Sequence, residues 1–159
     1  MKQRTFILCF IFLGLAISLL HGKWDIFGYF ENRFYLIDNP EKSWSNPDEK
    51  FNRGEPLRWI LHRDPDATGE PVSAHFQFME DDKDLFDLKA NEKELTGDLT
   101  AKIPANETEL SLKLSREADR RRNPRFYAVF ISDAQHENGG VFAVGEDENP
   151  PPEIDIGGP

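Results

Sequence analysis

The sequence contains a single cysteine, Cys9, among its 159 residues. Because Cys9 lies inside an apolar run near the amino terminus, the rest of the chain has no thiol for a disulfide or for nucleophilic catalysis. The chain also lacks the Gly-x-Ser-x-Gly, phosphate-loop and His-Glu-x-x-His motifs of common hydrolases and nucleotide-binding enzymes. These absences predict that the protein is not an enzyme, binds no cofactor and has a core that is stable without disulfides.

Basic residues are scarce relative to acidic ones. The chain has 19 Lys and Arg against 29 Asp and Glu, which gives a formal net charge of -10. Proteins that wrap nucleic acid, or that are generally attracted to an anionic membrane surface, need a basic face instead. Since Lys2 and Arg4 precede the apolar run, the chain from Lys23 onward carries 17 basic and 29 acidic residues, a net charge of -12. We therefore expect no nucleic-acid partner.

An uncharged apolar segment follows the first four residues. It covers residues 5–22, and Met1-Lys2-Gln3-Arg4 before it carries two basic side chains. A membrane-spanning helix needs about 20 apolar residues, whereas an export signal has an apolar stretch of about 7–15 residues. We expect an uncleaved helix that crosses the membrane once, with the basic end in the cytoplasm. The alternative is a cleaved signal and a secreted or periplasmic protein. Both place the rest of the chain outside the cytoplasm.

Composition divides the chain into four segments. Residues 1–22 are the membrane anchor or signal, and residues 23–55 are an aromatic juxtamembrane segment followed by a loop. Residues 56–145 are the predicted β-domain, and residues 146–159 are rich in acidic residues, Pro and Gly, so we expect them to be disordered. Residues 24–37 place aromatic side chains at helical spacing, but such residues suit strands equally well. A core strand, a continued anchor helix and an aromatic collar at the membrane interface remain open.

Apolar and polar side chains alternate along the predicted β-domain. The period-two runs are Leu57–Leu61, Ala74–Phe78, Leu95–Ile103 and Leu110–Leu114. Short strands with turn signals at regular spacing predict an all-β sandwich or barrel. Short connections such as Pro104–Glu107 favour antiparallel neighbours. The strand Phe126–Ile131 is apolar on both faces, which is typical of a central strand that is covered on both sides.

The last quarter of the chain resembles a known superfamily. Glu109–Ser115, Tyr127-x-Val129-x-Ile131-x-Asp133 and Gly140–Val144 are similar to the last three strands of an immunoglobulin-like sandwich. The resemblance implies an antiparallel immunoglobulin-like β-sandwich after one N-terminal hydrophobic helix, without the cysteine pair of antibody domains. The alternative is a lipocalin-like β-barrel, because Gly22-Lys23-Trp24 has the Gly-x-Trp form of that family. Neither resemblance implies a particular activity.

One basic cluster lies between two predicted strands of this acidic chain. It consists of Arg116, Arg120, Arg121, Arg122 and Arg125. The planar guanidinium group binds carboxylates through two hydrogen bonds, so these five residues are the candidate partner-binding site for an acidic protein or lipid headgroups. The alternative is neutralisation by nearby acids such as Glu117 and Asp119, because surface ion pairs, worth about 0–1 kcal/mol each, need no partner.

Three other patterns contain residue types that can form sites. His62 and His75 could meet across adjacent strands as metal ligands, but we expect ordinary half-exposed strand residues. The acidic run Glu80–Asp87 lacks the central Gly and regular spacing of a calcium loop, and it predicts a solvated turn. Asn106-Glu107-Thr108 has the form of a glycosylation acceptor, which matters only in a eukaryotic secretory pathway. We therefore expect no metal site.

These inferences predict function by elimination. We expect a membrane-anchored, extracytoplasmic binding or accessory domain that acts through protein–protein interaction with another membrane or exported protein. One alternative is an inhibitor or immunity protein whose acidic surface neutralises a basic toxin or hydrolase, in an association that is fast and sensitive to salt. The other alternative is a barrel that binds an apolar small molecule.

Overall fold

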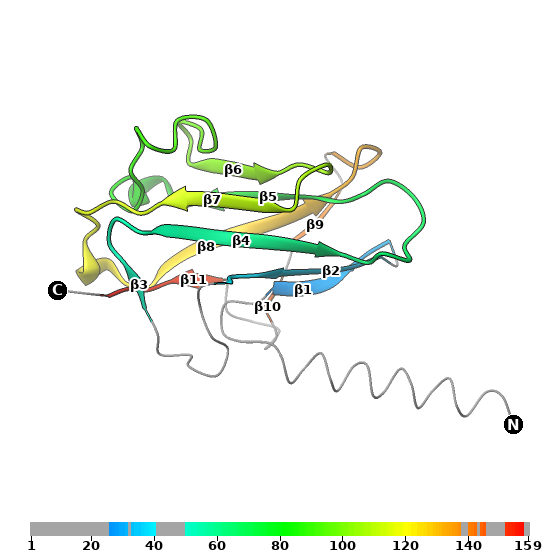
Figure 1. The fold of residues 1–159 in the computed structure, drawn as a ribbon, viewed down its shortest axis with the longest axis horizontal. Coiled ribbons are helices and arrows are strands. Elements are labelled where there is room, and N and C mark those ends of the chain that lie inside the picture. The colour runs from blue at the N-terminus through cyan, green and yellow to red at the C-terminus, as the bar shows by residue number, and fades with distance from the viewer. Residues whose placement is uncertain are drawn as a thin grey trace, which may run out of the picture.

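The computed structural model describes residues 26–31, 33–40, 50–137, 140–142, 144–145 and 152–157. These residues form β-strands joined by turns, with two short 3-10 helices, η1 (Glu80–Asp82) and η2 (Arg120–Arg122), and no α-helix (Figure 1). The strands are β1 (Ile26–Phe30), β2 (Arg33–Asp38), β3 (Phe51–Asn52), β4 (Pro56–Arg63), β5 (Ser73–Phe78), β6 (Thr100–Ile103), β7 (Glu109–Lys113), β8 (Arg125–Ser132), β9 (Val141–Phe142), β10 (Val144–Gly145), β11 (Glu153–Ile154) and β12 (Ile156–Gly157). The expected all-β class is confirmed for this part of the chain.

The predicted membrane anchor, residues 1–22, lies outside the described residues. Within the described ranges, no helix has the length and apolar character needed to cross a bilayer. Residues 26–30 and 33–38 belong to the segment for which strand and helix both remain open, and they form an antiparallel pair of β1 and β2, with Ile26 opposite Ile37. In this pair Ile26, Tyr35 and Ile37 are buried, so part of the aromatic segment belongs to the β-domain core.

The strands form two main antiparallel sheets. The first has the order β10-β1-β2-β4-β7, and the second has the order β11-β8-β5-β6, with β9 also paired to β8. A third, two-stranded pair joins β3 and β12 in parallel. Over the described residues neither main sheet closes on itself, so the alternative of a lipocalin-like barrel is wrong there.

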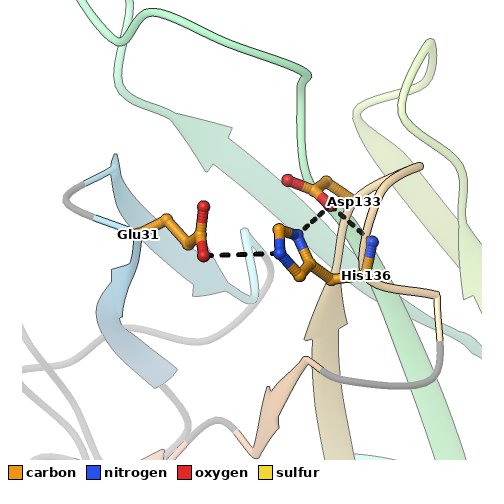
Figure 2. A group of neighbouring side chains, drawn as sticks. All are labelled: Glu31, Asp133 and His136. Carbon is orange, nitrogen blue, oxygen red and sulfur yellow. Dashed lines mark hydrogen bonds and ion pairs between the residues drawn. The ribbon is translucent and has the colours of Figure 1, made fainter.

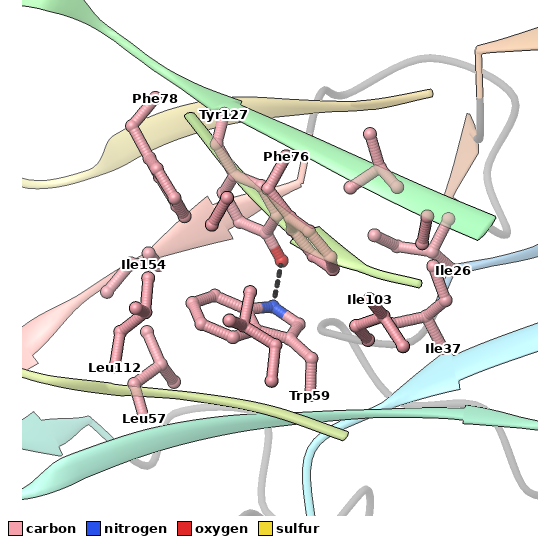
Figure 3. Packing of buried hydrophobic residues seen from close by; sticks show 14 of the residues in the cluster. Ile26, Ile37, Leu57, Trp59, Phe76, Phe78, Ile103, Leu112, Tyr127 and Ile154 are labelled. Carbon is pink, nitrogen blue, oxygen red and sulfur yellow. Dashed lines mark hydrogen bonds between the residues drawn. The ribbon is translucent and has the colours of Figure 1, made fainter. Parts of the chain in front are cut away.

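The two main sheets face each other across an aromatic core (Figure 3). Trp59 of β4 lies 5.8 Å from the ring of Tyr127 on β8 in an edge-to-face arrangement, and 5.2 Å from Phe76 on β5. The indole Nε1–H of Trp59 donates a hydrogen bond of 3.0 Å to the hydroxyl oxygen of Tyr127. Because both side chains are buried, this bond satisfies an indole donor that would otherwise lose its contact with water.

The shortness of Pro104–Glu107 predicts that it joins antiparallel neighbours. This prediction is wrong, because the strands on its two sides are not hydrogen-bonded to each other. The connection carries the chain from β6 in the second sheet to β7 in the first, where β7 pairs with β4. Both strands lie at the edges of their sheets, side by side in Figure 1, so a short link can bridge the two layers.

Two strand predictions differ from the structure. The period-two run from Leu95 becomes a strand only at Thr100, because turns precede it and Leu99 has a positive φ of 56°. Leu95 and Leu99 are nevertheless buried, so turns produce the same apolar spacing as a strand. Strand β8 is covered on one face only: Tyr127, Val129 and Ile131 are buried. On its other face Phe126 is 40% exposed, so the prediction of cover on both sides is wrong.

Residues 152–157 differ from the predicted disordered tail. Ile154 and Ile156 are each 1% exposed, because β11 pairs with β8 and β12 pairs with β3. The side chain of Asn123 donates to the carbonyl oxygen of Ile156 at 2.7 Å and accepts from its N–H at 3.2 Å. The alternation of Ile with acidic residues is a short amphipathic strand pattern, which the overall composition of the segment conceals. The remainder of residues 146–159 lies outside the described residues.

Candidate functional site

A groove of about 990 Å³ lies over the outer face of the second sheet. Its floor comes from the outward-facing side chains of β5, β6 and β8, including His75, Lys102 and Phe130. Lys93, Glu94 and Thr96 line it as well, and so does Phe142 of β9. Its volume lies at the upper end of the range of about 300–1,000 Å³ that is typical of ligand sites. We refer to this feature as the outer groove.

An exposed aromatic side chain lies at the edge of the outer groove. Phe142 is 69% exposed, and its ring lies 5.6 Å from that of Phe130 in an edge-to-face contact. Phe126, on the same outward face of β8 as Phe130, is 40% exposed but does not line the groove. Exposed apolar surface beside polar side chains is a feature of interaction sites. The sequence alone treated Phe126 and Phe130 as covered, so it missed this surface.

His75 in the groove forms a hydrogen bond with Ser132, with Nε2 and Oγ 2.8 Å apart. Burial lowers the pKa of the His75 imidazole, the charge of Lys102 lowers it further, and Glu137 opposes both effects. These effects favour the neutral imidazole. Ser132 is only 2% exposed. A buried hydroxyl that substrate cannot reach is a poor nucleophile, so this pair is better suited to shaping the groove than to acyl transfer.

The five arginines of the candidate partner-binding site have different environments. Arg125 is 2% exposed, and its guanidinium pairs with Asp82 and with Asp84, the latter at 2.7 Å. Arg122 is half-buried and pairs with Asp84 at 2.9 Å. The exposed members are Arg116, Arg120 and Arg121. Arg122 and Arg125 are thus paired with acidic residues of the same chain. For these two arginines this agrees with the alternative in which nearby acids neutralise the cluster. Partner binding by this segment stays a prediction.

The acidic run Glu80–Asp87 is the intramolecular counterpart of these arginines. Asp82 is 3% exposed, which makes the prediction of a solvated turn wrong at this residue. Burial alone would raise the pKa of the Asp84 carboxyl, but hydrogen bonds from Arg125 and from the backbone N–H of Asp119 outweigh it and lower the pKa. The η1 and η2 segments are far apart in sequence but face each other, and a single sequence does not reveal that pairing.

Acid is expected to destabilise the arginine segment through Asp119. Hydrogen bonds from Arg121 lower the pKa of Asp119 to about 2, against about 3.9 in an unfolded chain. A carboxyl with a lowered pKa contributes stability that is fully present above about pH 4 and is lost as the pH falls towards 2. The variant Asp119→Asn keeps the oxygen that accepts from the N–H of Arg121 but removes this titration. Urea midpoints measured from pH 5 to 2 should fall less steeply in Asp119→Asn than in wild type.

The matched control for this experiment is Asp66→Asn, which removes an exposed carboxylate in the turn after β4, outside the arginine segment. Its midpoints should follow wild type over the whole range. Parallel curves for Asp119→Asn and wild type would contradict the prediction.

His62 and His75 do not meet. His62 on β4 lies in the first sheet, where its Nε2 is 3.1 Å from Asp38 Oδ1, whereas His75 on β5 lies in the second sheet. The two strands are therefore not neighbours, and the metal site considered for this pair is wrong. Half-exposed His62 and half-buried His75 agree with the expectation of ordinary strand residues.

No family model, no curated protein and no solved structure matches this chain.

A cluster that the sequence did not indicate joins the β1–β2 turn to the loop after β8 (Figure 2). His136 Nδ1 lies 2.8 Å from Asp133 Oδ1, and His136 Nε2 lies 3.5 Å from Glu31 Oε1. Arg33 binds the other oxygen of Asp133 at 2.6 Å and lowers the pKa of its carboxyl to about 2. The spacing Asp133-x-x-His136 after a strand was the only signal in the sequence, and nothing there connected it to Glu31.

Proposed function

We propose that this chain is an extracytoplasmic binding or accessory domain, held at the membrane by residues 5–22, that contacts a partner protein through the outer groove. The main support is the exposed apolar surface at its edge, where Phe142 is 69% exposed and contacts Phe130. Aromatic residues are enriched at the energetic centres of protein interfaces. An isolated domain gains nothing from leaving such a ring in water, whereas a partner would bury it.

The groove also indicates the chemistry of the partner. Its apolar centre at Ala128 and Phe130 lies among charged residues of both signs, including Lys102 and Glu137. Such an arrangement fits an apolar side chain on a polypeptide whose neighbouring polar groups can pair with the rim. It does not favour a purely acidic or purely basic ligand.

We further propose an immunoglobulin-like topology for the domain. In such sandwiches the second and fifth strands pair in one sheet, while the third, sixth and seventh share the other. Here β4 pairs with β7, and β5 pairs with β8, which also pairs with β9. The buried pair of Trp59 and Tyr127 links the two sheets, where antibody domains have a disulfide.

Substitution of Phe142 by serine is expected to weaken partner binding. Loss of an aromatic residue at an interface centre costs about 2 kcal/mol or more, or roughly a 30-fold loss of affinity. Tagged full-length protein would be cross-linked in the membranes of its own host, and the captured proteins quantified. A specific partner captured by wild type should be lost with Phe142→Ser.

The matched control is Leu88→Ser, because Leu88 is 48% exposed and does not line the groove. It should retain the partner at the wild-type level. Equal capture by Phe142→Ser and wild type would refute the role of the groove, and equal loss in both variants would show non-specific apolar adhesion.

The alternative of an apolar small molecule is favoured by one observation, the groove volume of about 990 Å³, which suits a ligand as well as a peptide. This version needs no barrel. Native mass spectrometry of wild type and Phe142→Ser separates the two functions, because a bound small molecule lost in the variant, with protein capture unchanged, supports the alternative.

A further inference from the structure

We propose that His136 and Glu31 form a binding site for one divalent transition-metal ion of the zinc type, with Asp133 as the residue that positions the imidazole. The site connects the turn between β1 and β2 to the loop after β8, at the cluster drawn in Figure 2. It is independent of the outer groove and of the proposed partner binding.

The hydrogen bond to Asp133 decides which nitrogen of His136 is available. A carboxylate only accepts hydrogen bonds, so His136 Nδ1 must donate across the 2.8 Å to Asp133 Oδ1. In the neutral imidazole, Nε2 then carries the lone pair, and this atom faces Glu31. Metal-binding histidines in proteins commonly donate their second ring N–H to a carboxylate in this way, which fixes the tautomer and increases ligand basicity.

The separation of the two proposed ligand atoms fits a shared ion. His136 Nε2 and Glu31 Oε1 lie 3.5 Å apart, which is long for a hydrogen bond between them. Zinc bonds of about 2.0–2.2 Å to nitrogen and oxygen, at a tetrahedral angle, place two ligand atoms about 3.4 Å apart. The two side chains can therefore coordinate one ion with little movement.

Asp133 supports the site and is not itself a ligand. Its Oδ2 binds Arg33, and its Oδ1 also accepts the backbone N–H groups of Gln135 at 3.0 Å and His136 at 2.9 Å. Arg33 and Asp133 side chains are 9% and 4% exposed, so this support is buried and rigid. The ring of Phe30 packs edge-on against His136 at 5.7 Å and limits its rotation.

Charge and ligand type indicate which ion would bind. The carboxylates of Glu31 and Asp133 outnumber the one guanidinium of Arg33, which favours a cation. An imidazole with one carboxylate suits zinc, cobalt, nickel or copper, whereas calcium and magnesium prefer sites made of oxygen ligands alone. Two protein ligands leave coordination positions for water, or for a side chain from a bound partner.

The test is calorimetric titration of the full-length protein in detergent micelles with zinc chloride. Wild type should bind one Zn²⁺ per chain. His136→Ala and Glu31→Gln should each weaken binding at least tenfold, and Asp133→Asn should weaken it about 10–100-fold, as loss of an orienting carboxylate does in other metal sites. Co²⁺ in place of Zn²⁺ should give a visible absorption spectrum in wild type that His136→Ala lacks.

His62→Ala is the matched control, since His62 also faces a carboxylate, Asp38 at 3.1 Å, but is not part of the cluster. It should bind Zn²⁺ as wild type does. Unchanged affinity in both His136→Ala and Glu31→Gln overturns the proposal, and so does equal weakening by His62→Ala, which would indicate adventitious surface binding. Glu31 is exposed, so Glu31→Gln tests the site even if His136→Ala fails to fold, and circular dichroism identifies that case.

Discussion

Replacing Arg125 by alanine is expected to destabilise the domain by about 3–5 kcal/mol, because removal of one partner leaves buried charges unpaired. Arg125 is 2% exposed and pairs with Asp82 and Asp84, and it also donates to the carbonyl oxygen of Asp119 at 2.9 Å. Asp82 is itself 3% exposed and would lose its pairing with a buried guanidinium. The cost therefore comes from the acids that remain as much as from the lost hydrogen bonds.

Urea denaturation at pH 7 measures this effect, with Arg121→Ala as the control. Arg121 belongs to the same segment, but its side chain is 90% exposed where it pairs with Asp119. Solvent screens such a pair, so its removal should lower the urea midpoint far less than Arg125→Ala does. Equal midpoints for Arg125→Ala and wild type would mean that the network does not stabilise the fold.

A second variant tests why the network is costly to break. In Arg125→Met/Asp82→Leu the buried charges at both positions are removed together, and apolar side chains of similar size replace them. Replacing a buried ion pair by packed apolar residues is often neutral or stabilising. The double variant should therefore be more stable than Arg125→Ala, although Asp84 still loses its buried partner.

Much of the β-domain could be predicted from period-two alternation. Leu57, Trp59 and Leu61 of β4 are all buried, as their spacing indicated, and the same holds for Leu110 and Leu112 of β7. Alternation reports which side of a strand faces the core, and these strands each have one covered face. It does not report which strands are neighbours, so the short link before β7 was assigned to the wrong kind of connection.

Period-two alternation gave wrong predictions in two places: in turns whose apolar residues are buried, and on a strand face whose apolar residues are partly exposed. Leu95 and Leu99 are buried from turns, and an apolar spacing of two cannot distinguish a turn from a strand. The outward face of β8 contains Phe126 and Phe130, which composition alone interprets as core. Apolar residues kept at a surface for binding have the same sequence signal as residues that are buried for stability.

The sites depend on contacts that are distant in sequence. Arg33 and Asp133, which support the proposed metal site, are separated by 100 positions in the chain. The arginine segment and the acidic run are both visible in the sequence. Only the structure shows that they pair with each other. Local patterns identify residues whose side chains can form ion pairs or bind metals. Only the packing of the two sheets shows which of these residues meet.

Replacing Ile154 and Ile156 by alanine is the other change with a large expected effect. Each side chain is 1% exposed, and loss of a buried isoleucine to alanine costs about 2–5 kcal/mol through lost apolar contact and the cavity left behind. A disordered tail, which the composition of residues 146–159 predicts, would tolerate both changes at no cost. The double variant therefore decides whether these residues belong to the folded domain.

Thermal and urea unfolding of the full chain measure the effect, and Glu153→Ala/Asp155→Ala is the control. These two residues alternate with the isoleucines and are half-exposed, so their replacement leaves the apolar contacts in place. The isoleucine variant should unfold at much lower urea than wild type, and the control should lower the urea midpoint far less. A wild-type midpoint for Ile154→Ala/Ile156→Ala would contradict the docking of β11 and β12. A large loss of stability in the isoleucine variant would show that β11 and β12 are part of the folded core. Strand β11 pairs with β8, as β9 does beside the outer groove, so its docking also supports that part of the sheet.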